Sequence, residues 1–448
     1  LKTTLYALDV MSSIGRMDLV RYLHDNNVVA SSNAMDHAAT LDIFIFLQQH
    51  RTEGHTLYAL SIAASHGRLP IVEHILNTVT DKELDYKLAL NQAAIQGHVD
   101  VLRFIHHDGS YAKPGLRTLF RNDDTMDIAA RNGHLEVVKY LHDNEYGGCS
   151  QDAMHLASIK GHLDIVRFLH ENRTEGCYTH TMDLAARNGH LDIVTYLHNN
   201  RTEGCGSDAM EFASRKGHLG VIRFLHHHRT EGCTFEAIYN ASLKGHLEIV
   251  RFLHEHRTEG CTDDAMDFAA LNGHLDIVRY LHEHRTEGCT HDAMDYAAMY
   301  GHLDVVRFLH YNRTEGCSVY ALNNAARYGW IDIVMFLLDN RTEGCTVKAM
   351  DKAAKNGHLD IVKILHSRGK ECSQLAIENA AQKGRLEVVK FLRENRTEGH
   401  IPQAISIAKY NGFDMIVEYL STPLPTQSLL SSSSSLMEGA TSLKRQLS

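Results

Sequence analysis

Residues 261–288 read Cys261-Thr-Asp-Asp-Ala-Met-Asp-Phe-Ala-Ala-Leu-Asn-Gly-His-Leu-Asp-Ile-Val-Arg-Tyr-Leu-His-Glu-His-Arg-Thr-Glu-Gly288. Nearly the same run recurs along the chain, because the tripeptide Glu-Gly-Cys ends every 28 residues at Cys177, Cys205, Cys233, Cys261, Cys289, Cys317 and Cys345. A fixed internal period indicates a repeat architecture, in which each repeat packs only against its neighbours. The sequence therefore predicts an array of stacked repeats and not a globule with one central pocket.

The first half of the repeat predicts a short helix over roughly residues 262–272. Its apolar residues recur at i, i+1, i+4 and i+5, so they share one face: Ala265, Met266, Ala269 and Ala270. A Ser or Thr follows the cysteine and supplies the acceptor that an N-cap needs, at Ser150, Thr234, Thr262, Thr290, Ser318, Thr346 and Ser373. Gly273 follows the helix and favours the left-handed conformation that ends it.

The second half predicts another helix, with an apolar stripe of Leu275, Val278 and Leu281. In this repeat the helix is expected to end at His284. In four other repeats the equivalent residue is an asparagine: Asn172, Asn200, Asn312 and Asn340. Both residue types are enriched at positive φ, so we expect them to end the helix as a glycine would. Helices this short are marginal alone in water, so neighbouring repeats must hold them. The predicted fold class is all-α, a helical solenoid of stacked helix-turn-helix repeats.

The glycine after each first helix marks the repeats: Gly15, Gly67, Gly97, Gly133, Gly161, Gly189, Gly217, Gly245, Gly273, Gly301, Gly329, Gly357, Gly384 and Gly412. A further repeat around residues 34–47 lacks this glycine, so we expect about fifteen repeats over residues 1–421. The longer step from Gly97 to Gly133 predicts a loop insertion within residues 108–121. The serine-rich residues 422–448 predict a disordered tail.

The segment Ala185-Ala186-Arg187-Asn188-Gly189-His190-Leu191-Asp192-Ile193-Val194 recurs as residues 269–278 and 353–362 with few changes. It resembles the most recognisable part of the ankyrin repeat, which is Ala-Ala, two variable residues, Gly-His and an apolar second helix. The ankyrin repeat is ~33 residues long and opens with Thr-Pro-Leu-His, whereas these repeats have 28 residues and read Asp264-Ala-Met-Asp267 there. The resemblance implies a short-repeat variant with a truncated finger, a scaffold that binds a protein partner on its concave face.

Composition narrows the class of function. The net charge is −10 and the arginines and lysines are matched by carboxylates, which argues against a nucleic-acid partner. No apolar run is long enough to cross a bilayer, so we do not expect membrane insertion. No signal peptide is visible, and nine cysteines at one place in successive repeats are typical of a reducing compartment. We expect a cytoplasmic protein.

The columns of cysteine and histidine could suggest metal sites. Neighbouring helices lie roughly 8–10 Å apart, whereas zinc ligands converge within ~2.0–2.3 Å of one ion, so a column with one residue per repeat does not form such a site. We interpret the cysteines as small packing residues and predict no metal and no cofactor. The adjacent histidines 226–228 are a local alternative, although neighbours on a helix point in different directions.

Two histidine columns need separate interpretations. The Gly-His column resembles the structural histidine of ankyrin repeats at the inter-helix turn, at His98, His134, His162, His190, His218, His246, His274, His302 and His358. The second column lies in the last turn of the second helix, where a protonated ring would suit the helix dipole, at His170, His198, His226, His254, His282, His310 and His366.

Each link between repeats carries an arginine followed two residues later by a glutamate, as in Arg173 and Glu175. We interpret these pairs as a solvated, charge-balanced edge, with a recurrent ligand-binding edge as the alternative. No nucleotide-binding, metalloprotease or serine-hydrolase motif occurs. Residues that recur in every repeat do not form the unique cluster that an active site needs. We therefore predict no enzyme and no small-molecule substrate.

The residues ten and eleven positions after each cysteine resemble those that ankyrin proteins use for recognition. We predict that a protein partner contacts Arg187, Arg215, Met299, Tyr300, Arg327 and Tyr328. The last four belong to adjacent repeats, and their side-chain types are enriched at interfaces. Two alternatives stay open: a passive structural spacer, or the substrate-recruiting arm of an enzyme whose catalytic domain lies upstream of Leu1.

Overall fold

The computed structural model describes residues 6–78, 85–107, 124–144 and 148–423. Every regular element in these ranges is a helix, and none of the described residues forms a strand. Thirty helices follow one another as fifteen antiparallel pairs, which confirms the all-α prediction. The predicted insertion at 108–121 and the tail beyond residue 423 lie outside the described residues.

The chain divides into two compact bodies, which we call body 1 (residues 1–241 and 251–260) and body 2 (residues 242–250 and 261–448). Body 1 contains α1 (Ala7–Ser13), α2 (Met17–Asp25), α3 (Asn33–Asp36), α4 (Leu41–His50), α5 (Ala59–Ser65), α6 (Leu69–Thr78), α7 (Tyr86–Gln96), α8 (Val99–His107), α10 (Asp124–Asn132), α11 (Leu135–Asp143), α12 (Gln151–Lys160), α13 (Leu163–Asn172), α14 (Thr181–Arg187), α15 (Leu191–Asn200), α16 (Asp208–Lys216) and α17 (Leu219–His228).

Body 2 contains α20 (Asp264–Leu271), α21 (Leu275–His284), α22 (Asp292–Tyr300), α23 (Leu303–Asn312), α24 (Val319–Tyr328), α25 (Ile331–Asn340), α26 (Lys348–Asn356), α27 (Leu359–Ser367), α28 (Leu375–Gln382), α29 (Leu386–Asn395), α30 (Ile401–Tyr410) and α31 (Asp414–Ser421). The division between the bodies passes through α18 (Glu236–Lys244) and α19 (Leu247–His256). None of the described helices has the length and apolarity needed to span a bilayer.

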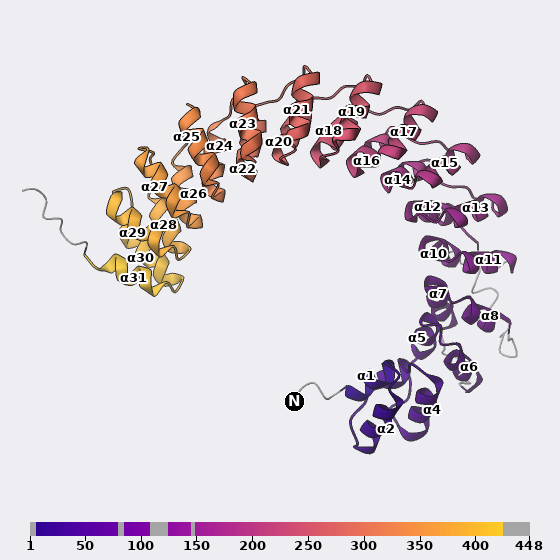
Figure 1. Ribbon diagram of the computed structural model, residues 1–448. Coiled ribbons are helices and arrows are strands. Elements are labelled where there is room, and N and C mark those ends of the chain that lie inside the picture. The colour runs from indigo at the N-terminus through magenta and orange to yellow at the C-terminus, as the bar shows by residue number, and fades with distance from the viewer. Residues whose placement is uncertain (1–5, 79–84, 108–123, 145–147, 424–448) are drawn as a thin grey trace, which may run out of the picture. The chain divides into compact units, whose positions relative to one another are not determined.

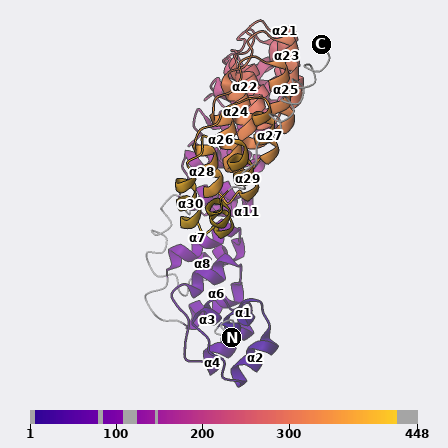
Figure 2. The same cartoon turned by 90° about the vertical axis from the view of Figure 1, so that its left-hand side faces the viewer.

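Each body consists of two layers of helices. The first helices of successive repeats pack side by side, as α22, α24 and α26 do in body 2. The second helices form the other layer, and Figure 2 shows α23, α25 and α27 on the opposite side of body 2 from α22, α24 and α26. In body 2 the layer of first helices lies on the concave side (Figure 1). We call these the first-helix layer and the second-helix layer.

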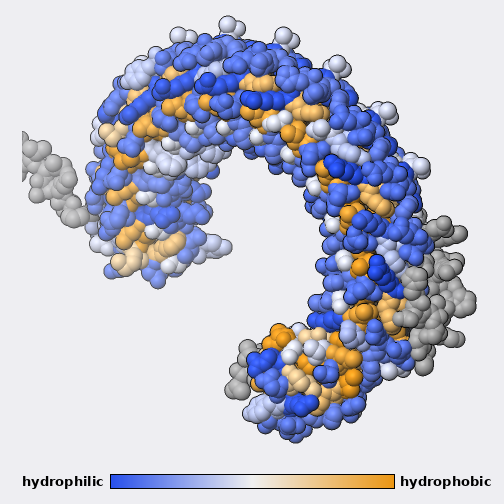
Figure 3. Space-filling model, turned by 45° about the vertical axis from the view of Figure 1, so that its right-hand side comes forward, coloured by the Kyte–Doolittle hydropathy of each residue, from blue (hydrophilic) through white to orange (hydrophobic). Residues whose placement is uncertain are grey.

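The core lies between the layers and between successive repeats. The four predicted apolar residues of α20 are all buried: Ala265, Met266, Ala269 and Ala270. On α21 the buried stripe is Ile277, Val278 and Leu281, while the predicted Leu275 is only half-buried. Alanines on the first helices leave room for close approach of the neighbouring repeat. On the visible surface, hydrophobic patches lie among hydrophilic residues (Figure 3).

The predicted starts of the first helices are confirmed at Ser150 and Ser318, which are the N-caps of α12 and α24. The N-caps of α22, α26 and α28 are instead the residues after the predicted ones, at His291, Val347 and Gln374. The Ser150 hydroxyl accepts a hydrogen bond from the Asp152 amide at 3.0 Å, and Thr290 does the same for Asp292 at 3.1 Å. The helix predicted from Thr262 begins two residues later, and its N-cap is Asp263. All the marker glycines have positive φ, as the prediction requires.

The predicted end of the second helix is correct in position but wrong in mechanism. The residue after the helix, such as Arg173 or Arg285, is extended, and Asn27 is the only non-glycine residue with positive φ in the described part of the chain. Instead, the side chain of the last helical residue binds a carbonyl four residues back. Asn172 Nδ2 donates to the Phe168 carbonyl at 2.9 Å, and His284 Nδ1 lies 2.9 Å from the Tyr280 carbonyl. The asparagine or histidine thus caps the helix through its side chain.

Candidate partner-binding surface

Four of the predicted contact residues lie at the ends of two neighbouring first helices, α22 and α24. Tyr300 and Tyr328 end these helices, and their side chains are 50% and 43% exposed. Met299 and Arg327 precede them, and the Arg327 guanidinium lies 5.1 Å from the centroid of the Tyr328 ring. The structure therefore presents two exposed tyrosines with an arginine stacked beside one of them.

Trp330 completes this surface, although the sequence analysis did not select it. It occupies the Gly-His position of its repeat, and its Nε1 donates to the Met299 carbonyl at 3.0 Å. The indole covers Gly301, where an added Cβ would lie 2.7 Å from the ring, yet 41% of Trp330 stays exposed. The sequence did hold a signal, because this is the only tryptophan in the chain and it replaces a histidine. Tyr300, Arg327, Tyr328 and Trp330 form what we call the aromatic patch.

Arg187 and Arg215 belong to body 1 and lie near the ends of α14 and α16, where both are exposed. The Arg187 guanidinium lies 5.8 Å from the centroid of the Phe212 ring. The six predicted residues thus lie at two adjacent register positions in four repeats, and among the described residues it is the four in body 2 that lie with exposed aromatic rings.

The Gly-His column joins neighbouring repeats. His190 Nε2 lies 3.1 Å from the Ile159 carbonyl of the preceding repeat, and His302 Nε2 lies 3.1 Å from the Leu271 carbonyl. The ring also covers the preceding marker glycine, since a Cβ on Gly161 would lie 2.7 Å from His190. These contacts confirm the interpretation of this column as structural.

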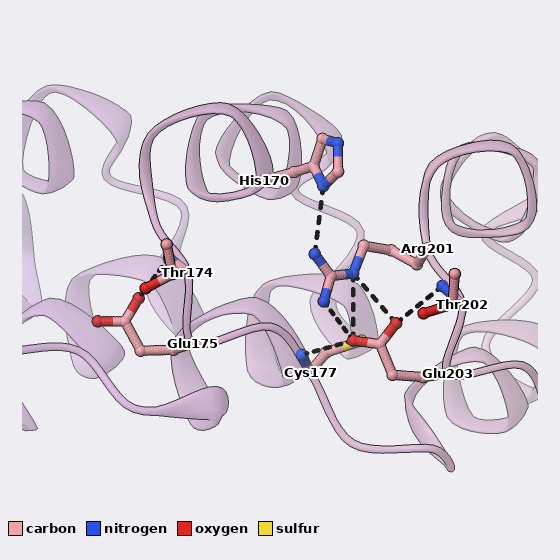
Figure 4. Close-up of polar contacts among 7 residues, drawn as sticks. All are labelled: His170, Thr174, Glu175, Cys177, Arg201, Thr202 and Glu203. Atoms are coloured by element: carbon pink, nitrogen blue, oxygen red, sulfur yellow. Dashed lines mark hydrogen bonds and ion pairs between the residues drawn. The ribbon is translucent and has the colours of Figure 1, made fainter.

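The second histidine column faces an arginine of the next repeat (Figure 4). Arg201 Nη1 donates a long hydrogen bond of 3.4 Å to His170 Nδ1, and Arg313 does the same to His282. Burial, with added repulsion from neighbouring charges, lowers the pKa of His198 and His226 below the usual range. The expectation that the helix dipole favours the protonated ring is therefore wrong for these two residues.

The arginine and glutamate of each link form an ion pair with each other, as Arg201 and Glu203 do in Figure 4. Glu203 also accepts hydrogen bonds from the Thr202 amide at 3.1 Å and from the Cys177 amide of the preceding link at 3.3 Å. Burial favours a higher pKa for Glu203, but the hydrogen bonds from Arg201 and the backbone hold this pKa at about 2. The two side chains are only 22% and 19% exposed. The ion pair confirms the charge-balanced part of the interpretation, but the edge is only partly solvated, and Glu203 also contacts the preceding link.

A column of buried carboxylates, which the sequence analysis missed, also joins the repeats. Asp267 accepts from the Thr290 amide at 2.9 Å and from the Thr290 hydroxyl at 2.6 Å. Burial raises the pKa of Asp267 to about 6, although the two hydrogen bonds from Thr290 act to lower it. The same arrangement occurs for Asp36 with Thr56, Asp127 with Ser150, Asp295 with Ser318 and Asp351 with Ser373. The signal was an acidic residue in the first helix 20 to 23 residues before the capping Ser or Thr.

The cysteines are free thiols, either buried or half-buried. Burial raises the pKa of Cys205 to about 11 and that of Cys289 to about 12, so these thiols are protonated and unreactive at neutral pH. Among the described residues, the ligand atoms of His291, Asp292 and Asp295 come within 4.8 Å of one another. Asp295 already accepts two hydrogen bonds from Ser318, so this cluster includes a member of the carboxylate column.

Comparison with known proteins agrees with the geometry. The family model described as Ankyrin repeats (3 copies) matches residues 112–183, 182–295, 238–317 and 294–376. No curated protein matches the chain. The matches together cover more than half of the sequence, and the described helices form the stacked pairs that the match implies. The chain belongs to the ankyrin-repeat family.

Proposed function

We propose that the protein is a non-catalytic scaffold that binds a protein partner on the concave, first-helix layer of body 2. Ankyrin repeats generally mediate protein–protein interactions and are typically not enzymes. The observation that carries the proposal is the aromatic patch, in which Tyr300, Tyr328 and Trp330 are exposed side by side on adjacent repeats. Tyrosine, tryptophan and arginine supply most of the binding energy at interfaces.

The contacts within the aromatic patch support this function over a passive spacer. The hydrogen bond from Trp330 to the Met299 carbonyl and the stacking of Arg327 on Tyr328 hold the rings in place before any partner arrives. A partner that binds such a preorganised surface loses less conformational entropy. A spacer needs only the buried contacts between repeats. We include Arg187 and Arg215 as further contact residues in body 1.

We also propose the bounds of the repeat array and the compartment in which the protein acts. The array would extend over residues 1–421 and the tail over residues 422–448. The protein would act in the cytoplasm without a cofactor, a nucleic-acid partner or a small-molecule substrate.

The experiment compares proximity labelling in cells by the full chain and by two variants. Tyr300→Ser/Tyr328→Ser removes the two rings of the patch. Tyr311→Ser is the control, because Tyr311 is also exposed but lies on α23 in the second-helix layer. Partners labelled by the wild type should persist with the control and be lost with the double variant. With a purified partner, the double variant should weaken binding by about 2 kcal/mol or more.

Two outcomes would contradict the proposal. A partner that binds the double variant at full affinity would place the site elsewhere. Labelling that is the same for the wild type and for a chain with scrambled surface residues would favour the passive spacer.

A further inference from the structure

A row of three lysines lies beside the aromatic patch on the same layer. Lys348, Lys352 and Lys355 are spaced i, i+4 and i+7 on α26, so they share one face of that helix. They stand 28 residues after Tyr320, Asn324 and Arg327 of α24, at the same positions of the next repeat. Because α24 and α26 pack side by side, the lysine row continues the surface that carries the patch.

No carboxylate neutralises this row within the part of the chain that the structure describes. The only acidic residue on α26 is Asp351, which is buried and accepts hydrogen bonds from the amide and hydroxyl of Ser373. Two other lysines of the described chain do have carboxylate partners: Lys139 pairs with Glu136, and Lys390 pairs with Glu387. Lys348 is exposed and Lys352 and Lys355 are half-buried, and none of the three forms an ion pair among the described residues.

The patch itself has the opposite charge at its margin. Asp332 follows Trp330 closely in the first turn of α25, and Asp304 occupies the corresponding place in α23; both are exposed. Asp360 occupies the same exposed place in α27, so the carboxylate margin continues beside α26. What changes along the stack is the face of the first helices, from aromatic rings at the ends of α22 and α24 to a row of lysines on α26. A complementary partner needs apolar groups at one end and negative charge at the other.

We infer that the surface of α24 and α26 binds a protein segment in which aromatic or aliphatic anchors are followed by a cluster of carboxylates. This inference rests on the proposed function and adds the chemistry of the partner. Its anchors contact Tyr300, Tyr328 and Trp330, and its carboxylates pair with Lys348, Lys352 and Lys355. A single-stranded nucleic acid fits less well, because its evenly spaced phosphates would also face Asp304 and Asp332, and the chain has a net charge of −10.

The test selects binders from a random peptide library displayed on phage, with the immobilised full chain as bait. Selected peptides should carry Asp or Glu clustered on one side of an aromatic residue. In solution, Lys352→Glu should weaken a selected peptide about threefold to tenfold, and Lys348→Glu/Lys352→Glu/Lys355→Glu at least about tenfold. Lys363→Glu is the matched control for the single variant, because Lys363 is exposed on α27 in the second-helix layer, and it should leave the affinity unchanged.

The outcomes separate this inference from the proposed function. Peptides that need Tyr300 and Tyr328 but show no enrichment of carboxylates would overturn the inference and leave the proposed function standing. Acidic peptides that bind Tyr300→Ser/Tyr328→Ser at full affinity would overturn the proposed site. A pool of single-stranded RNA that binds the wild type, and fails to bind the triple lysine variant, would show that the partner class is wrong.

Discussion

At the scale of single residues, each repeat is fixed by contacts that reach into the next one. Gly329 has a φ of +89°, and a Cβ there would lie 2.7 Å from the His358 ring. The glycine is therefore needed twice, for its left-handed backbone and for the space that the next histidine fills. The recurring Gly-His pair therefore forms the turn between the two helices of one repeat and also the contact with the next repeat.

Gly329→Ala should lower the free energy of unfolding by about 2 kcal/mol or more, because it adds a steric clash to the cost of a left-handed alanine. Gly369→Ala is the matched control: Gly369 has a φ of +66°, but nothing lies within 4 Å of its added Cβ. It should cost only about 1 kcal/mol. Urea unfolding of both variants checks this, and equal costs would mean that the His358 contact contributes nothing.

Asp267 offers a second test at this scale. Asp267→Ala leaves the half-buried Thr290 amide without its acceptor and should cost about 1–3 kcal/mol. Asp267→Asn should cost under about 1 kcal/mol, because the chain uses an asparagine at the equivalent Asn323. There the side-chain carbonyl accepts from the Thr346 amide at 3.1 Å and the side-chain amide donates to the Thr346 hydroxyl at 3.0 Å. A similar loss for both variants in thermal unfolding would refute the role of this hydrogen bond.

At the scale of helices, the second-helix layer contains rings that must stay neutral. His226 on α17 is packed against the Phe252 ring at 5.5 Å and is near the charges of His227, Arg257, His256 and Glu259. Burial and the repulsion from the cations lower the pKa of His226, and only Glu259 acts in the opposite direction. His198 has the same surroundings, with Arg229, His228 and Glu231. Protonation of either ring would place two cations against each other between adjacent repeats.

This arrangement predicts a loss of stability in acid. A histidine whose folded pKa is lowered stabilises the fold above the usual pKa of about 6.5, and this contribution is lost as the pH falls through the folded value. The melting temperature should therefore fall less between about pH 7.5 and pH 5.5 for His198→Gln/His226→Gln than for the wild type. Asp267, whose pKa is raised to about 6, acts in the opposite sense but is common to both proteins. Identical acid shifts for the two proteins would contradict this assignment.

The helices could be predicted from the sequence because their signals are local. The alanine and methionine spacing of α20 and the end of α21 at His284 depend on neighbours within one turn. The links between repeats depend on residues more than 20 positions apart, so the pairing of Asp267 with Thr290 was missed. Tyr300 and Tyr328 were selected from the register, but Trp330 became part of the surface only through its contact with Met299. Burial reversed the expected behaviour of His198 and His226, because the sequence does not show which arginine faces them.

At the scale of the whole molecule, the same few contacts between adjacent repeats occur throughout both bodies. The histidine bonded to a carbonyl and the carboxylate bonded to the capping residue each join a repeat to the next one. The glutamate of a link can also accept from the backbone of the preceding link, as Glu203 does from the Cys177 amide. In such an array, stability is set by each repeat and its immediate neighbours. Exposed residues such as those of the aromatic patch are then free to differ between repeats without loss of the fold, which is what a binding surface requires.

Hydrogen–deuterium exchange of the full chain with Met266→Asp tests this account most directly, with Met266→Leu as the control. Met266 is 1% exposed, so the aspartate would bury an unpaired charge between α20 and its neighbours, whereas leucine keeps the site apolar. The account predicts that protection is lost in α20 to α22 and retained in α1 to α8 and α28 to α31. Loss of protection spread evenly over all described helices, or no loss at α20, would contradict it.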